Sequence, residues 1–337
     1  MFSRLPLNKA FLGTAKSYDH YCHTRGVLSS IPLSVQVSQK EKDSGSLTWQ
    51  NLELATRAIH RDGLVVLENV LENQDLDFLN EKMVQDARTL QALGDSGPFN
   101  YNKGNIQQDP PMTPTYFNSS IFLNPIATQV TTSVLGPKPR LSFVSGNSAL
   151  PPAANSPPQS QPVHSDADID HPSCPFALVI NIPLIDMNIE NGSTEVWLGT
   201  HTGSGINCQE GAHGERASGR IKEELLRNRR EERAPSQPVV KKGSIVVRDL
   251  RLWHAGKPNY SEAVRVMLAM IHFAPWYRNE MKVQFAQELK AELEEKGSDL
   301  QIQADFIPAK SVEEGYLNKP FGNAYDFDQK DPLVGIF

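Results

Sequence analysis

The sequence predicts a mainly β protein with flanking helices, built as a sandwich or jelly roll. Strand-like runs separated by turn-rich stretches dominate the chain after residue 100. These runs are LSFVSGN, FALVINIPLI, STEVWLG, SIVVRDL and RVMLAMIHF. Short strands with turns between them are typical of sandwiches and jelly rolls. With 337 residues, the chain is long enough for one large β-rich domain.

Helical patterns flank these strands. Residues 47–63 predict a helix that ends at Gly63, because glycine is favoured just past a helix end. The run LVVLENV then predicts a short strand. Apolar residues recur every three or four positions over 72–94, which predicts a second helix with Asn73 as its N-cap and Gly94 as its stop.

The remaining segments complete a single predicted domain over residues 1–337. Residues 1–48 are predicted to form an irregular N-terminal arm, because prolines and a polar stretch interrupt any periodic pattern. The polar insert 203–238 is predicted to be lid-like and to contain one helix. Apolar residues four apart predict a further helix over 281–297.

Composition and charge limit the partners and the compartment. The net charge is −6 and the pI about 5.9, so we expect no nucleic-acid partner, which would need a basic surface. No apolar run approaches the roughly 20 residues that cross a bilayer, so we expect no membrane partner. Cys22, Cys174 and Cys208 are far apart in sequence, which favours a reducing, cytoplasmic location.

The motif QPVHSD contains two candidate metal ligands. His164 and Asp166 are two residues apart, so in a strand their side chains point to the same face and can converge on one ion. The proline-rich loop 149–162 leads directly into this motif. Because H-x-D is common by chance, the motif needs a further ligand to indicate a metal site.

His254 supplies that ligand, and Arg265 adds a second kind of group. His254 follows the predicted strand SIVVRDL. Two histidines and one carboxylate suit non-haem Fe(II) with open positions, whereas structural zinc favours four closed ligands. Arg265 begins the next strand on an otherwise apolar face, where a charge is costly unless it meets an anion. We therefore expect Arg265 to bind a dicarboxylate cosubstrate that chelates the iron.

Three stretches together resemble the phytanoyl-CoA dioxygenase family of Fe(II)/2-oxoglutarate oxygenases, and in particular its fungal branch that oxidises secondary metabolites. They are QPVHSD (161–166), FALVINIPLIDMNIENGSTEVWLGTH (176–201) and GSIVVRDLRLWHAGKPNYSEAVRVML (243–268). The resemblance implies a double-stranded β-helix, which is a cupin-like jelly roll. It also implies a set of site residues, with iron ligands His164, Asp166 and His254, the 2-oxoglutarate anchor Arg265, and the further 2-oxoglutarate contacts Gln161, Thr194 and Asn181.

By the same resemblance, the chain uses Fe(II), 2-oxoglutarate and O2 to oxidise an unactivated C–H bond of a small-molecule substrate, with release of succinate and CO2. The implied substrate is a fungal secondary metabolite or its precursor. Related fungal enzymes suggest a homodimer. The motifs do not encode whether the outcome is hydroxylation, desaturation, epoxidation, rearrangement or endoperoxide formation.

Two other functions stay open from the residues themselves. One is a cupin-like metal enzyme that does not use 2-oxoglutarate and would not need Arg265. The other is a catalytically silent binding protein that kept the fold. The sequence also leaves open which residues line the substrate pocket, with Phe143, Asn147 and Tyr101 as candidates. His272 alternates to the opposite face from Arg265, so we expect it to pack in the core.

Overall fold

The computed structural model describes residues 29–153, 157–213, 218–318 and 326–329. Its main element is a nine-stranded sheet with the order β1-β2-β10-β6-β12-β5-β4-β3, to which β14 adds beside β5. The strands of this sheet are β1 (Ser34–Gln36), β2 (Leu64–Glu68), β3 (Phe99–Asn100), β4 (Asn102–Gln108), β5 (Arg140–Ala149), β6 (Ala177–Pro183), β10 (Ile245–Asp249), β12 (Arg265–Phe273) and β14 (Gln301–Ile302). Its four central strands, β10, β6, β12 and β5, are antiparallel neighbours.

Short strands form a second, smaller layer around His164. Two pairs belong to it, β7 (Glu195–Val196) with β11 (His254–Ala255), and β8 (Gln209–Glu210) with β9 (Arg220–Ile221). The backbone of His164 joins the two pairs, because it bridges to Arg220 on one side and to His254 on the other. His164 and His254 exchange two backbone hydrogen bonds of 2.9 and 3.0 Å. The two candidate histidines are therefore fixed side by side by the backbone.

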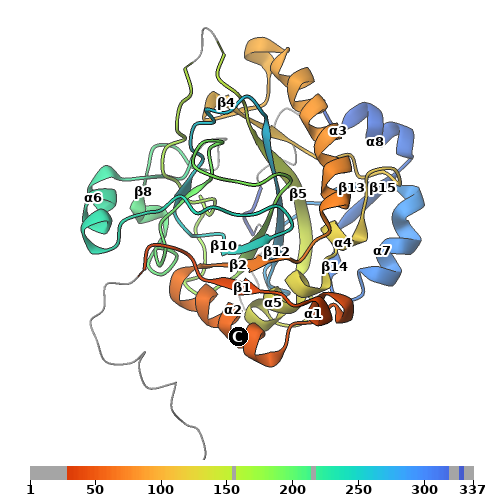
Figure 1. Ribbon diagram of the computed structural model, residues 1–337, viewed down its shortest axis with the longest axis horizontal. Helices are drawn as coiled ribbons and strands as arrows, with labels where there is room; N and C mark the ends of the chain where they lie inside the picture. The colour runs from red at the N-terminus through yellow and green to blue at the C-terminus, as the bar shows by residue number, and fades with distance from the viewer. Residues whose placement is uncertain (1–28, 154–156, 214–217, 319–325, 330–337) are drawn as a thin grey trace, which may run out of the picture.

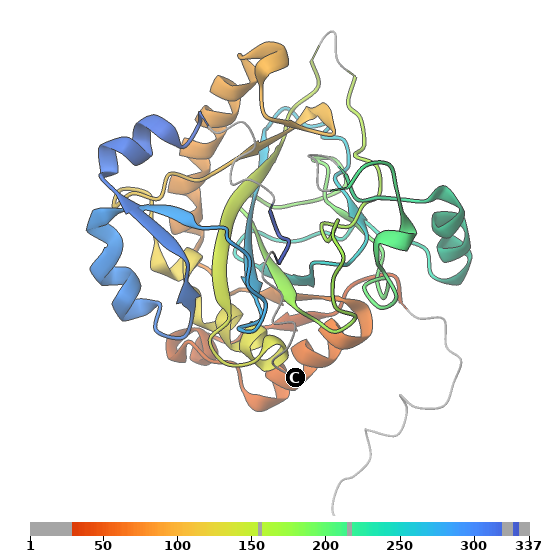
Figure 2. The ribbon, with the colours of Figure 1, turned by 180° about the vertical axis from the view of Figure 1, so that it is seen from behind.

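Helices surround the strands, both on the outside of the large sheet and beside the smaller layer (Figure 1). They are α1 (Gln39–Ser44), α2 (Trp49–Asp62), α3 (Asn73–Gln91), α4 (Ser119–Phe122), α5 (Pro125–Leu135), α6 (Glu223–Glu232), α7 (Lys290–Lys296) and α8 (Ala309–Gly315). Helices α2 and α5 pack on β2, β6 and β10, whereas α3 packs on β4 and β12. In Figure 2 the strands curve around an interior that the helices do not enter. The predicted mainly β jelly roll with flanking helices is confirmed.

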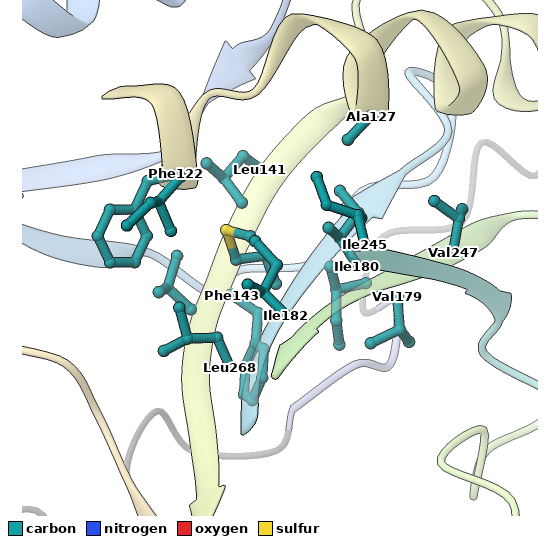
Figure 3. Packing of buried hydrophobic residues seen from close by; sticks show 14 of the residues in the cluster. Phe122, Ala127, Leu141, Phe143, Val179, Ile180, Ile182, Ile245, Val247 and Leu268 are labelled. Carbon is teal, nitrogen blue, oxygen red and sulfur yellow. The ribbon is translucent and has the colours of Figure 1, made fainter. Parts of the chain in front are cut away.

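Alternation along the strands separates the core from the interior cavity. On β6, Ile180 and Ile182 lie in the core cluster that includes Ala127 of α5 (Figure 3). The alternate positions Val179 and Asn181 line the cavity, and Val179 also contacts the core cluster. The same sheet thus packs against helices with one face and forms the wall of a site with the other.

Three local predictions need correction. Glu72, not Asn73, is the N-cap of α3, and it makes no side-chain capping bond. Residues 1–48 are not wholly irregular, because β1 pairs with β2 and α1 begins with a capping box at Ser38. Residues 1–28 lie outside the described part. Residues 283–286 form the strand β13, which pairs with β15 (Ala304–Ile307), and only 290–296 are α-helical. Buried apolar residues four apart fit both a helix and a strand, so the spacing could not decide.

The predicted insert 203–238 is tied into the smaller layer through β8, β9 and α6. At its far end Arg233 forms a buried ion pair with Asp62, at 2.8 Å, and Pro238 lines the interior cavity. A role as a lid stays a prediction. Among the helices that the structure describes, none combines the length and the apolar character needed to cross a bilayer.

Candidate functional site

A cavity of about 110 Å³ lies between the large sheet and the smaller layer. Its walls come from β2, β4, β5, β6, β10 and β12 on one side and from the segments around His164 and His254 on the other. All seven residues that the sequence singled out line this cavity. They are Gln161, His164, Asp166, Asn181, Thr194, His254 and Arg265.

His164, Asp166 and His254 form the one group found among the described residues that could hold a metal ion. One ligand atom from each lies within 4.8 Å of the others. The Asp166 Oδ1 atom is 3.7 Å from His164 Nε2 and 3.6 Å from His254 Nε2. Two nitrogens and one oxygen on one side of a cavity match the facial triad of non-haem iron sites.

Backbone carbonyl groups orient both histidine rings. His164 Nδ1 lies 2.9 Å from the carbonyl oxygen of Pro162, and His254 Nδ1 lies 3.0 Å from that of Leu252. A carbonyl oxygen only accepts, so each Nδ1 carries the proton and each Nε2 keeps its lone pair for a metal. The burial of both rings favours the same neutral form. It lowers the pKa of His254 to about 3 and lowers that of His164 as well, so both rings are ready to ligate at neutral pH.

The surroundings of the partly exposed Asp166 side chain favour its ionised form. Burial acts to raise the pKa of this carboxyl group, but Arg248 and the two histidines outweigh that effect and hold it well below its usual range. Arg248 Nη2 donates a hydrogen bond to Asp166 Oδ2. The carboxylate that a divalent metal requires is therefore present before any metal binds.

Arg265 lies at the start of β12 and is only 1% exposed. Its Nη2 donates to the carbonyl oxygen of Gly192 at 2.9 Å. Its Nε and Nη1 atoms are buried and have no hydrogen-bond partner among the described residues. Burial lowers the pKa of Arg265 to about 10, so the side chain is still a cation at neutral pH. A buried cation without a carboxylate partner is costly, which indicates that an anion completes this part of the cavity.

Gly192 shapes the turn that meets Arg265. It has a φ of +75°, and a Cβ atom there would lie 2.4 Å from the carbonyl oxygen of Lys257. Only glycine fits this turn without strain. The acceptor for Arg265 is thus set by the Asn191–Gly192 step that the sequence contains.

The chain matches the family model of phytanoyl-CoA dioxygenase (PhyH) over residues 59–267, which is more than half of its length. The chain belongs to this family. The enzyme class predicted from the sequence, a non-haem iron and 2-oxoglutarate-dependent oxidoreductase, is that of the family. Its iron and 2-oxoglutarate fit the residues present, because the three ligand atoms converge and two buried nitrogens of Arg265 have no hydrogen-bond partner within the described ranges. Membership in the fungal branch stays a prediction.

Several solved structures are similar to this chain. The epimerase SnoN in complex with Fe3+, alpha ketoglutarate and nogalamycin RO has a TM-score of 0.50 and 16% identity; the match covers 66% of this chain and 84% of that one. EctD from S. alaskensis in its apoform has a TM-score of 0.49 and 16% identity, over 84% of this chain and 94% of that one. The non-heme monooxygenase ThoJ has a TM-score of 0.44 and 22% identity, over 66% of this chain and 77% of that one. The PhyH match and the SnoN likeness agree with a double-stranded β-helix.

The weaker 2-oxoglutarate candidates already have protein partners. Gln161 Oε1 accepts from the backbone N–H of Gly256 at 2.8 Å, so this side chain ties the His164 segment to the His254 segment. Asn181 donates to the carbonyl oxygen of Leu268 at 3.2 Å and accepts from Arg248 at 3.0 Å. Their predicted contact with 2-oxoglutarate, and that of Thr194, stay predictions.

Sequence reasoning missed Arg248, a buried cation on β10 that contacts Asp166. A signal was present in the sequence. Arg248 lies two residues after Val246 and so shares the inward face of the strand, where a charge needs a partner. Of the residues left open, Phe143 and Asn147 line the cavity. Tyr101 packs its ring on that of His164, with centroids 4.7 Å apart.

His272 lies in the core, as its alternation with Arg265 predicted. Its Nδ1 atom is 2.9 Å from the Thr131 hydroxyl of α5, on the helix-covered face of the sheet. The ring is only 2% exposed. It therefore contributes to packing and does not face the cavity.

Proposed function

We propose that this protein uses iron(II) and 2-oxoglutarate to oxidise an unactivated C–H bond of a small, uncharged organic substrate, with succinate and CO2 as co-products. His164, Asp166 and His254 would hold the iron, and Arg265 would bind the distal carboxylate of 2-oxoglutarate. One cavity contains three converging ligand atoms and a buried arginine, two of whose nitrogens have no partner in the part of the chain that the structure describes. This observation carries the proposal.

The metal and its cosubstrate would supply the oxidising chemistry once O2 binds. The protein's own part is to position the reactants and to exclude water. The large sheet contributes the apolar wall that does so, because the inward residues of β2, β6, β10 and β12 are mostly aliphatic. These residues include Leu64, Val66, Val179, Val246, Met267, Ala269 and Ile271.

The lining of the cavity supports an uncharged and largely apolar substrate. Beyond the candidate ligands, the ionic residues among its described lining are Arg248, which is paired with Asp166, and Arg265, which is assigned to 2-oxoglutarate. Phe143, Ile271 and Phe327 add apolar surface. Neutral polar groups such as Gln107 and Asn147 could fix the orientation of a hydroxyl or carbonyl group. A secondary metabolite or its precursor fits this description.

A cytoplasmic location and a homodimer are parts of the same proposal. The two cysteines in the described part, Cys174 and Cys208, are both free thiols, which agrees with a reducing compartment. Neither a nucleic acid nor a membrane is proposed as a partner, since the chain is acidic overall.

An anaerobic titration tests the proposal. The metal-free protein receives Fe(II) and then 2-oxoglutarate, and the visible absorption spectrum is recorded. We expect a metal-to-ligand charge-transfer band that needs both additions and is absent from the His164→Ala and His254→Ala variants. A band that persists in both variants would contradict the ligand assignment. Iron binding without the band would point to a metal enzyme that does not use 2-oxoglutarate.

A further inference from the structure

Arg248 makes two side-chain hydrogen bonds that form a continuous connection across the cavity wall. Its Nε donates to Asn181 Oδ1 at 3.0 Å, and its Nη2 donates to Asp166 Oδ2. Asn181 in turn donates to the backbone carbonyl oxygen of Leu268 on β12 at 3.2 Å. The candidate iron ligand is thus linked, through two side chains, to the backbone of the central sheet.

The two oxygens of Asp166 have different surroundings. Oδ2 is taken by the guanidinium group of Arg248, whereas Oδ1 faces the Nε2 atoms of His164 and His254 at 3.7 and 3.6 Å. A carboxylate held in this way offers one oxygen to a metal and not two. The guanidinium plane gives this contact a fixed direction, which a single point charge would not do.

A purely structural ion pair is a weaker account of this arrangement. Arg248 lies in an apolar wall beside Val246 and Val179, where an aliphatic side chain would pack well. Buried ion pairs can often be replaced by apolar residues without loss of stability, so stability alone gives little reason for a charge here. Its Nη1 atom also has no hydrogen-bond partner among the described residues, which adds a cost.

We propose that Arg248 is a positioning residue that holds Asp166 as a one-oxygen ligand, and that Asn181 holds Arg248 in place. This inference rests on the proposed function. A triad that uses three of six coordination positions leaves three, enough for 2-oxoglutarate and O2. If Asp166 bound through both oxygens, one of those positions would be lost.

The test uses Mn(II) as the probe, because it needs no anaerobic handling and its bound waters can be counted by ¹⁷O relaxation. In the parent protein we expect three bound waters and binding of 2-oxoglutarate to the Mn(II)-loaded protein. In Arg248→Met we expect two waters and Mn(II) binding that is unchanged or tighter. We expect 2-oxoglutarate binding to weaken by about tenfold or more, because the one pair of positions left need not be the pair that lets the distal carboxylate reach Arg265. Tighter metal binding is expected because a nearby cation is removed while the carboxylate gains a second contact.

Three further variants separate positioning from folding. Asn181→Leu should change the water count and the 2-oxoglutarate affinity in the same direction as Arg248→Met, but by less. Arg248→Lys should keep three waters if its ammonium group still reaches Asp166. Arg233→Met removes a different buried ion pair, that with Asp62, and should leave the water count and the 2-oxoglutarate affinity unchanged.

The outcomes distinguish this inference from the proposed function. Three waters and 2-oxoglutarate affinity within about twofold of the parent in both Arg248→Met and Asn181→Leu would overturn it. Loss of both Mn(II) and 2-oxoglutarate binding in these variants, with a lowered melting temperature, would assign Arg248 a structural role and overturn it too. A parent protein that binds neither Mn(II) nor 2-oxoglutarate would refute the proposed function itself.

Discussion

Replacing Arg265 by methionine should change ligand affinity and stability in opposite directions. Burial lowers the pKa of Arg265 from 12.5 to about 10, and one pKa unit corresponds to about 1.4 kcal/mol, so burying this cation costs about 3 kcal/mol. The variant loses one hydrogen bond, to Gly192, worth about 1 kcal/mol. Without ligand, the free energy of unfolding of the variant should therefore be about 2 kcal/mol higher than that of the parent, which makes the variant the more stable protein.

Affinity for 2-oxoglutarate should fall in the same variant. Removing one partner of a buried, hydrogen-bonded charge pair costs about 2–5 kcal/mol, which is about 30-fold or more in Kd. Calorimetric titration of the Mn(II)-loaded protein measures the affinity, and urea denaturation of the metal-free protein measures the stability. Arg265→Lys is the control, because it keeps the charge but loses the two-pronged geometry, and it should bind 2-oxoglutarate with intermediate affinity.

One combination of results would refute this reasoning. If the ligand-free Arg265→Met protein is less stable than the parent while its 2-oxoglutarate affinity is unchanged, Arg265 has a structural partner and is not the anchor. If Arg265→Met is both less stable and weaker in 2-oxoglutarate binding, the loss of affinity would be explained by a disturbed fold.

Two further predictions concern stability. Burial lowers the pKa of His272 to about 3. Below about pH 6.5 the unfolded chain therefore takes up a proton that the folded protein does not. The free energy of unfolding should fall as the pH falls below that value, by up to about 1.4 kcal/mol per pH unit. His272→Leu should reduce this slope between pH 6 and pH 4.5 in urea denaturation, and an unchanged slope would assign it to other groups. Arg233→Met removes the partner of Asp62 Oδ1 at 2.8 Å, while Arg61 still pairs with Oδ2. The loss of this buried, charged hydrogen bond should cost about 1–3 kcal/mol. The exposed pair Arg57–Glu53 provides the control, since Arg57→Met should cost less than about 0.5 kcal/mol; equal costs in the two variants would contradict the role given to burial.

Several features follow from short-range patterns that any reader of the sequence can use. The helix before Gly63 ends where predicted, because a left-handed residue closes it. The alternation along RVMLAMIHF places Arg265 on the cavity side and His272 on the helix side, as the two-residue period of a strand requires. By contrast, the four-residue spacing at Phe285 was ambiguous, and its strand character depends on pairing with β15.

The sequence by itself determined the family, the jelly roll and the candidate ligands, because these depend on local periodicity and on motifs that can each be recognised within one continuous stretch. Only the tertiary structure decided how the ligands are held. Arg248 and Asp166 are 82 residues apart, and Gln161 meets Gly256 across 95 residues. Such contacts depend on which strands pair and in which register, and no short stretch of sequence carries that information.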